Sequence, residues 1–207
     1  MKKLIVFFLL AFLYVLPFGM VLSGKVIVLD PGHGGIDKGA VGPSGLLEKK
    51  INLELVMDLA GILKAQGATV YLTRTSDKYV YLEDRIELAN KKHADLFVCV
   101  HHNSLEGYPK FDETEVFYLN EGDTSKFAAE CIASAVGKAL DLKWKVKKDD
   151  FKVLRLAKIP AVLVESSFIS CVKREKWLRN PFNIWKESVA LDFGILSYFE
   201  NVGGEVK

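Results

Sequence analysis

Two histidines and two glutamates stand at positions from which a folded chain could gather them into one reactive site. Each histidine and one glutamate follow a short apolar run of the kind that forms a buried strand, and the other glutamate opens an amphipathic segment. The carboxyl ends of parallel strands meet along one edge of a sheet, where ligands bind. We therefore expect four side chains to converge there: His33, Glu48, His101 and Glu165.

Two imidazoles and one carboxylate can hold a catalytic zinc ion, because they leave one coordination position open for water. We assign this role to His33, Glu48 and His101, since the glycine-rich loop 39–46 lets the start of the next helix fold back toward His33. Glu165, on a separate strand, suits the acid/base that takes the proton of the water and passes it to a leaving amine. The predicted chemistry is hydrolysis of an amide or an ester.

Each of these residues also has an ordinary structural explanation. Glu48 could complement the dipole of its helix, and Glu165 could pair with an arginine such as Arg155. His33, in the turn Asp30-Pro31-Gly32-His33-Gly34-Gly35, could bond only to backbone. One shared site explains all four positions at once, so we prefer it.

Three further residues are candidates for binding substrate. Asn103 and Ser104 follow His101 and can form hydrogen bonds with a substrate or a ligand, and Arg155 is the third. His102 adjoins His101, and neighbouring residues of a strand point to opposite faces. We therefore expect His102 either on the surface or behind the metal ligands.

Apolar runs alternate with amphipathic segments along the chain, which predicts an α/β fold. We expect a single domain with a mostly parallel twisted sheet and helices on both faces. The segment Phe151–Leu156 is expected to be extended, and the basic run Lys143–Lys148 to be a solvated surface. The regular elements expected, in chain order, are strand 26–29, helix 48–67, strand 68–73, helix 82–92, strand 95–100, strand 115–119, helix 127–140, strand 159–164 and helix 181–199.

Residues 1–23 have the pattern of an export signal: a basic start, the long apolar run 4–22, and small residues before Gly24. We expect cleavage before Gly24. The alternative is an uncleaved amino-terminal anchor, because the run is long enough to span a bilayer. In either case we expect the working domain, 24–207, to lie outside the cytoplasmic membrane.

The composition excludes some classes of function. The net charge is +2, and without Lys2 and Lys3 the basic and acidic side chains balance. Nucleic-acid binding requires a strong basic excess, so we expect no nucleic-acid partner. The chain has three cysteines, far apart and without a CxxC motif, so we expect neither a disulfide framework nor a cysteine metal site.

Several segments, taken in order, form a specific pattern. They are Val28–Gly35, Glu48-Lys49 at the start of a helix, Leu72-Thr73-Arg74 with Asp77, Leu82 and Arg85, Ala94–Val98 before His101, Phe151–Arg155, and Ile159–Glu165. Together they resemble the zinc-dependent N-acetylmuramoyl-L-alanine amidases, from about Lys25 to Phe199. The chain departs from the family at Thr114 and Ser167, where glycine is common, and at Cys171, where asparagine is common.

The resemblance implies hydrolysis of the amide between the lactyl group of N-acetylmuramic acid and L-alanine in peptidoglycan. It implies zinc held by His33, Glu48 and His101, with Glu165 as the catalytic acid/base, in a secreted or periplasmic enzyme. We find no separate wall-binding domain and expect a monomer. Two alternatives stay open: a zinc peptidase that cuts within the stem peptide, and a wall-binding module without turnover.

Overall fold

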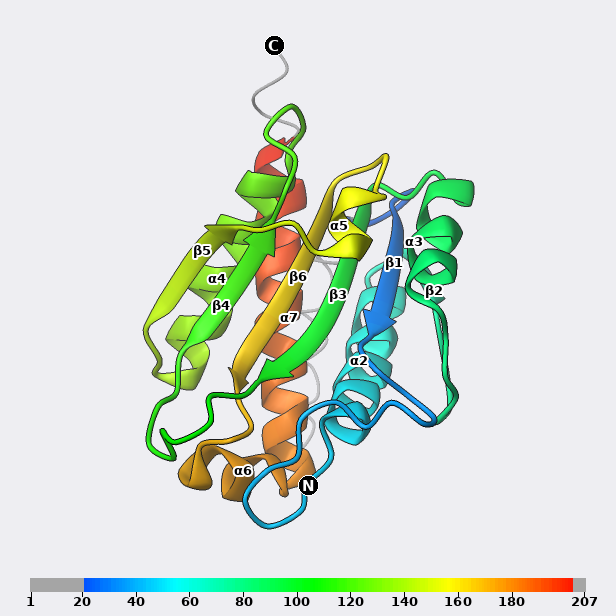
Figure 1. Ribbon diagram of the computed structural model, residues 1–207. Helices are drawn as coiled ribbons and strands as arrows, with labels where there is room; N and C mark the ends of the chain where they lie inside the picture. The colour runs from blue at the N-terminus through cyan, green and yellow to red at the C-terminus, as the bar shows by residue number, and fades with distance from the viewer. Residues whose placement is uncertain (1–20, 203–207) are drawn as a thin grey trace, which may run out of the picture.

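Runs of branched apolar residues build the centre of a six-stranded sheet with the strand order β2-β1-β3-β6-β4-β5 (Figure 1). The computed structural model describes residues 21–202. Strands β2, β1, β3 and β6 are parallel, β4 is antiparallel to β6, and β5 is parallel to β4. The strands are β1 Val26–Pro31, β2 Thr69–Leu72, β3 Leu96–Asn103, β4 Thr114–Tyr118, β5 Trp144–Lys148 and β6 Ala161–Phe168.

Helices cover both faces of the sheet, so the predicted α/β class is confirmed. Helices α2, α4 and α7 bury apolar side chains in one core against the sheet, and α3 and α5 contribute to a second core on the other face (Figure 1). The strands between the two cores are apolar on both sides, as strands of buried parallel sheets are. The helices are α2 Glu48–Ala65, α3 Leu82–Lys91, α4 Ser125–Leu140, α5 Lys152–Arg155, α6 Val172–Leu178 and α7 Pro181–Val202.

One local prediction was wrong, and two elements were not predicted. The expected extended segment Phe151–Leu156 contains the helix α5, which is a single turn and too short for a helical period to be visible. The basic run Lys143–Lys148, expected to be a solvated surface, is exposed or half-buried and also contains the edge strand β5, which was not predicted. Lysines are common on exposed strand edges, where they discourage pairing with another chain. Helix α6 was not predicted.

Strands β3 and β6 are also longer than expected. β3 continues through His101 to Asn103, and β6 continues through Glu165 to Phe168. His101 and Glu165 are paired in the register of these two strands. The two side chains are therefore held by regular sheet rather than by loops, which fixes them more precisely.

The described residues begin beside the amino-terminal end of β1. Val21–Gly24 form a turn there, and the side chain of Leu22 is fully buried. The predicted export signal 1–23 lies almost entirely outside the described residues. Cleavage before Gly24 would remove Leu22 from the core. Among residues 21–202, none of the helices combines the length and the apolar character needed to cross a membrane.

Candidate metal centre

The turn after β1 presents His33 in an uncommon backbone conformation. The φ angle of His33 is 61°, in the left-handed region, and Gly34 follows with φ 129°. Arg85 donates from Nη2 to the carbonyl of His33 at 2.8 Å, and Arg74 donates from Nη2 to the carbonyl of Gly32 at 2.8 Å. Two buried guanidinium groups therefore hold this turn against the sheet.

Glu48, the first residue of α2, is buried and turned back toward that turn. Its Oε2 accepts a hydrogen bond from the backbone N–H of Ala40 at 2.7 Å. A Cβ atom on Gly39 would lie 2.5 Å from Glu48 Oε2 and 2.5 Å from His33 Cδ2. The glycine is therefore needed for the loop to pass between these side chains, and the helix start folds back toward His33 as predicted.

His101 completes the cluster from β3. Its Nδ1 lies 2.8 Å from Glu48 Oε1, while His33 Nε2 lies 3.0 Å from Glu48 Oε2. The two imidazole rings meet edge to face, with their centroids 4.7 Å apart. One ligand atom from each of the three residues lies within 4.8 Å of the other two. The structure therefore brings together the three residues that the sequence predicts as metal ligands.

The electrostatics of this cluster favour positive charge at its centre. Burial works against the charged form of Glu48, but the hydrogen bonds and charges of His101 and His33 outweigh it and hold the pKa of this carboxyl far below its usual range. Burial also works to lower the pKa of His33, yet Glu48 and Asp37 raise it. Asp37 Oδ2 lies 2.8 Å from His33 Nδ1 and leaves Nε2 facing the cluster. The donor set therefore suits a cation.

Glu165 stands next to His101 in the sheet, and Glu115 of β4 lies opposite it in the antiparallel pair β4–β6. Burial raises the pKa of Glu165 well above its usual value, and the nearby charges of Glu48 and Glu115 raise it further. Its Oε2 is buried and has no hydrogen-bond partner among the described residues. Such a carboxyl has a raised affinity for a proton, so it can take up a proton and pass it on during a reaction.

A cavity of about 390 Å³ opens onto these groups. Its lining combines polar residues of the cluster with aromatic and aliphatic side chains. This combination suits a ligand that carries both a reacting polar group and apolar substituents. The lining includes His33, His101, Glu165, Tyr79, Leu82, Phe151 and Leu163.

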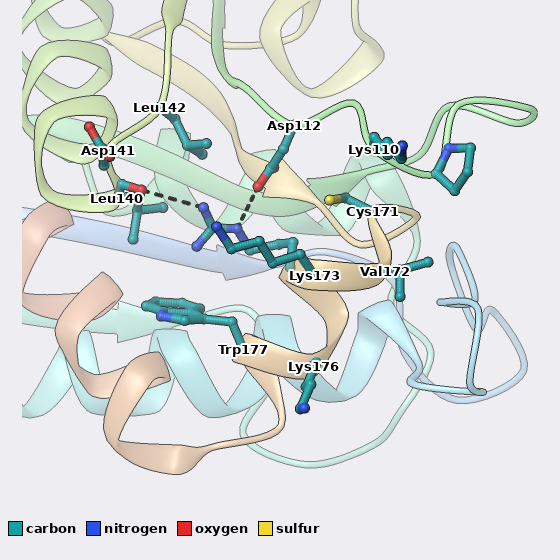
Figure 2. A pocket seen from close by; sticks show the side chains of 12 residues that line it. Lys110, Asp112, Leu140, Asp141, Leu142, Cys171, Val172, Lys173, Lys176 and Trp177 are labelled. Atoms are coloured by element: carbon teal, nitrogen blue, oxygen red, sulfur yellow. Dashed lines mark hydrogen bonds and ion pairs between the residues drawn. The ribbon is translucent and has the colours of Figure 1, made fainter.

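A larger cavity, of about 680 Å³, lies beside α6 (Figure 2). Arg174 in its wall donates from Nε to Asp112 at 2.7 Å and lies over the ring of Trp177, 4.7 Å from its centroid. The lining contains none of the predicted metal ligands, nor Glu165. Size alone therefore does not identify the reactive site in this chain.

The sequence matches the family model described as N-acetylmuramoyl-L-alanine amidase over residues 27–191. The chain belongs to this amidase family. It is 36% identical to the uncharacterised protein YqiI of Bacillus subtilis, over 86% of this chain and 87% of that one. It is 30% identical to the N-acetylmuramoyl-L-alanine amidase AmiA of Salmonella typhimurium, over 86% of this chain and 77% of that one.

Solved structures of amidases share the fold. The N-acetylmuramoyl-L-alanine amidase AmiC2 of Nostoc punctiforme superposes with a TM-score of 0.81 at 34% identity, over 86% of this chain and 99% of that one. The catalytic domain of the amidase CwlV from Bacillus (Paenibacillus) polymyxa superposes with a TM-score of 0.80 at 32% identity, over 85% and 98% of the two chains. The predicted family resemblance is confirmed, and the chain is an amidase enzyme.

The residues predicted to bind substrate do not line the cavity of this amidase. Asn103 donates from Nδ2 to Glu115 Oε2 at 3.0 Å and accepts from the backbone N–H of Ser104 at 2.7 Å. Arg155 is exposed and pairs with Asp150 at 2.7 Å rather than with Glu165. Asn103 and Arg155 thus each have a local polar partner. Substrate binding by Asn103, Ser104 and Arg155 stays a prediction.

Sequence reasoning missed several residues that support the centre. Arg74 and Arg85 lie in segments of the family pattern, but their contacts with the His33 turn come from long-range folding. Glu175 of α6 accepts hydrogen bonds from the backbone of Ser44 and Leu46 and so fixes the loop before Glu48. No local signal marks Glu175, because its helix was itself not predicted.

Proposed function

We propose that this amidase is a zinc enzyme that cleaves the amide between the lactyl group of N-acetylmuramic acid and L-alanine in peptidoglycan. The observation that carries the proposal is the convergence of His33, Glu48 and His101, together with a cavity that His33, His101 and Glu165 line. The family membership supports peptidoglycan as the substrate. His33, Glu48 and His101 would hold the metal.

The residues present fit a zinc ion. Two neutral imidazoles and one carboxylate form an ordinary zinc ligand set with a position left open. Glu48 stays ionised because of its two histidine neighbours, and Asp37 orients His33 from behind, as carboxylates orient zinc-bound histidines. Zinc bound there would polarise the amide carbonyl and lower the pKa of water.

Glu165 performs the proton transfers in this proposal. It accepts a proton from the attacking water as the water oxygen bonds to the carbonyl carbon, and it donates that proton to the nitrogen as the C–N bond breaks. The products are a lactyl carboxylate and the free amino group of L-alanine. The buried position of Glu165 suits this cycle, because it raises the proton affinity of the carboxylate.

The setting that goes with this reaction is outside the cytoplasmic membrane. We propose that residues 1–23 direct export, either as a cleaved signal or as an anchor, and that residues 24–207 act on the wall as a monomer. The cell-wall amidases among the relatives support this setting.

Product analysis tests the function. Purified zinc-loaded protein is incubated with peptidoglycan, and the released fragments are identified by mass spectrometry. We expect intact stem peptides that begin with a free L-alanine amino group. Fragments cut within the stem peptide would instead support the zinc peptidase and overturn the assignment.

Two variants separate the roles of the carboxylates. Glu165→Ala should keep one zinc ion per chain but lose about 10²–10⁴-fold in turnover, while Glu48→Ala should lose the metal. Glu113→Ala is the matched control, because it removes a buried carboxylate that pairs with Lys145 outside the cavity. The control should keep both zinc and turnover, and normal turnover of Glu165→Ala would remove Glu165 from the mechanism.

A further inference from the structure

A chain of buried polar side chains lies behind Glu48, on the face of the sheet covered by α2 and α7. It consists of Asn52 on α2, His102 on β3 and Glu187 on α7. The side chains of His102 and Glu187 are fully buried, and Asn52 is fully buried as well. Burying three polar groups in an apolar core is costly unless each one forms hydrogen bonds, so we asked which hydrogen bonds these side chains form.

The alternation of β3 creates this arrangement. The side chain of His101 lies on the face of the sheet with the cavity, and that of His102, the next residue, lies on the opposite face. Its Nε2 lies 3.0 Å from Glu187 Oε1, and its Nδ1 lies 2.8 Å from Asn52 Oδ1. One strand thus supplies both a residue of the metal centre and the support behind it.

The hydrogen bonds of Asn52 have a defined direction. Its Nδ2 faces two acceptors, Glu48 Oε1 at 3.2 Å and the carbonyl of Gly32 at 3.4 Å. Because Nδ2 faces acceptors, Oδ1 faces His102, and His102 Nδ1 must donate to it. The chain of contacts therefore runs from Glu187 through His102 and Asn52 to the carboxylate of Glu48.

We propose that His102 and Glu187 are positioning residues that hold Asn52 against Glu48 and thereby set the orientation of this metal ligand. The inference rests on the proposed zinc site. Glu48 Oε1 also accepts from the backbone N–H of His102 at 3.2 Å, so His102 restrains the carboxylate both directly and through Asn52. Partners of this kind are worth about 10–100-fold in metal affinity in other metal sites.

The test measures zinc affinity of the purified full chain by competition with a chromophoric chelator, together with the visible absorption spectrum of the Co²⁺-substituted protein. Glu187→Ala and His102→Phe should each weaken zinc binding about 10–100-fold and alter the Co²⁺ spectrum. Glu187→Gln keeps a hydrogen-bonding partner for His102 Nε2 and should retain most of the affinity. The double variant should bind zinc no more weakly than His102→Phe alone, because both act through one chain of contacts.

The matched control is Asp192→Ala on the same helix. Asp192 is also a buried carboxylate, but its partner is Gln66, with Asp192 Oδ2 2.9 Å from Gln66 Nε2, and neither contacts the centre. This variant should keep zinc affinity within about twofold. If Glu187→Ala and His102→Phe change thermal stability but bind zinc as the control does, the positioning role is refuted.

Glu48→Ala distinguishes the failure of this inference from failure of the proposed function. If Glu48→Ala loses zinc and the two positioning variants do not, only the positioning role is wrong. If Glu48→Ala also binds zinc normally, the proposed metal site is wrong, and the positioning role fails with it.

Discussion

Arg85 holds the His33 turn from inside the protein, and its removal should destabilise the fold strongly. Its guanidinium is 2% exposed and pairs with Asp30, which is fully buried, through Nη1 and Oδ1 at 2.8 Å. It also donates to the carbonyls of Pro31 at 2.9 Å, His33 at 2.8 Å and Val80 at 3.1 Å. Arg85→Ala would leave a buried carboxylate and backbone carbonyls without this partner.

The size of the effect follows from that burial. Removing one partner of a buried ion pair costs about 3–5 kcal/mol, because the other charge stays in the interior without its partner. For a domain of this length, each kcal/mol lowers Tm by about 2–4 °C, so we expect a fall of about 6–20 °C. The loss is a large part of a typical stability of about 5–15 kcal/mol.

Thermal unfolding followed by circular dichroism measures this effect, with Arg155→Ala as the matched control. Arg155 also pairs with an aspartate, Asp150, but both side chains are more than half exposed. Such a surface pair contributes about 0–1 kcal/mol. Equal Tm values for Arg85→Ala and Arg155→Ala would refute the reasoning. Arg85→Lys should fall between them, since it can keep one contact with Asp30 but not the full set.

Three further predictions concern the core, the loop and the metal. Burial raises the pKa of Asp192 from 3.8 to about 6, so this group stabilises the fold below pH 4 and loses that contribution, about 3 kcal/mol, as the pH rises through 6. Asp192→Asn should therefore raise Tm at pH 7.5 and make Tm depend less on pH. Parallel plots of Tm against pH for the variant and the parent protein would contradict this. Gly39→Ala, at φ 65° with Glu48 Oε2 2.5 Å from the new Cβ, should weaken zinc binding in a chelator competition, whereas Gly45→Ala, with open space around it, should not. Zinc at 100 times its Kd should stabilise the metal-free protein by about 2.7 kcal/mol in calorimetry, and the Glu48→Ala variant should show no such gain.

The cluster of His33, Glu48 and His101 could be predicted from the sequence because each residue follows an apolar run or opens an amphipathic segment. His33 follows an apolar strand, and Glu48 opens an amphipathic helix, so both positions are visible without any contact information. The parallel connection of β1 and β3 then brings His33 and His101 to one edge. The fold class follows from the same alternation of strands and helices.

The surroundings of the other candidate residues depend on contacts between distant segments, which the sequence does not show. Asn103 and Arg155 were predicted to bind substrate from their residue types, and the sequence did not show that Glu115 and Asp150 are their local partners. His102 was expected on the surface or behind the ligands, and only the position of α7 decides between these places, because Glu187 meets it 85 residues away. Edge strand β5 was hidden by its lysines, whose charge masks the alternation of a strand.

The turn at Val21–Gly24 and the His33 turn lie at the two ends of β1, whose six residues span about 20 Å. Helix α7 also ends near the Val21–Gly24 turn, because Lys25 Nζ lies 5.3 Å from the centroid of the Phe199 ring. An affinity tag, fusion partner or solid support joined ahead of Val21 would therefore be remote from the opening that receives substrate. Enzyme immobilised through that end should still digest insoluble material as bulky as whole sacculi.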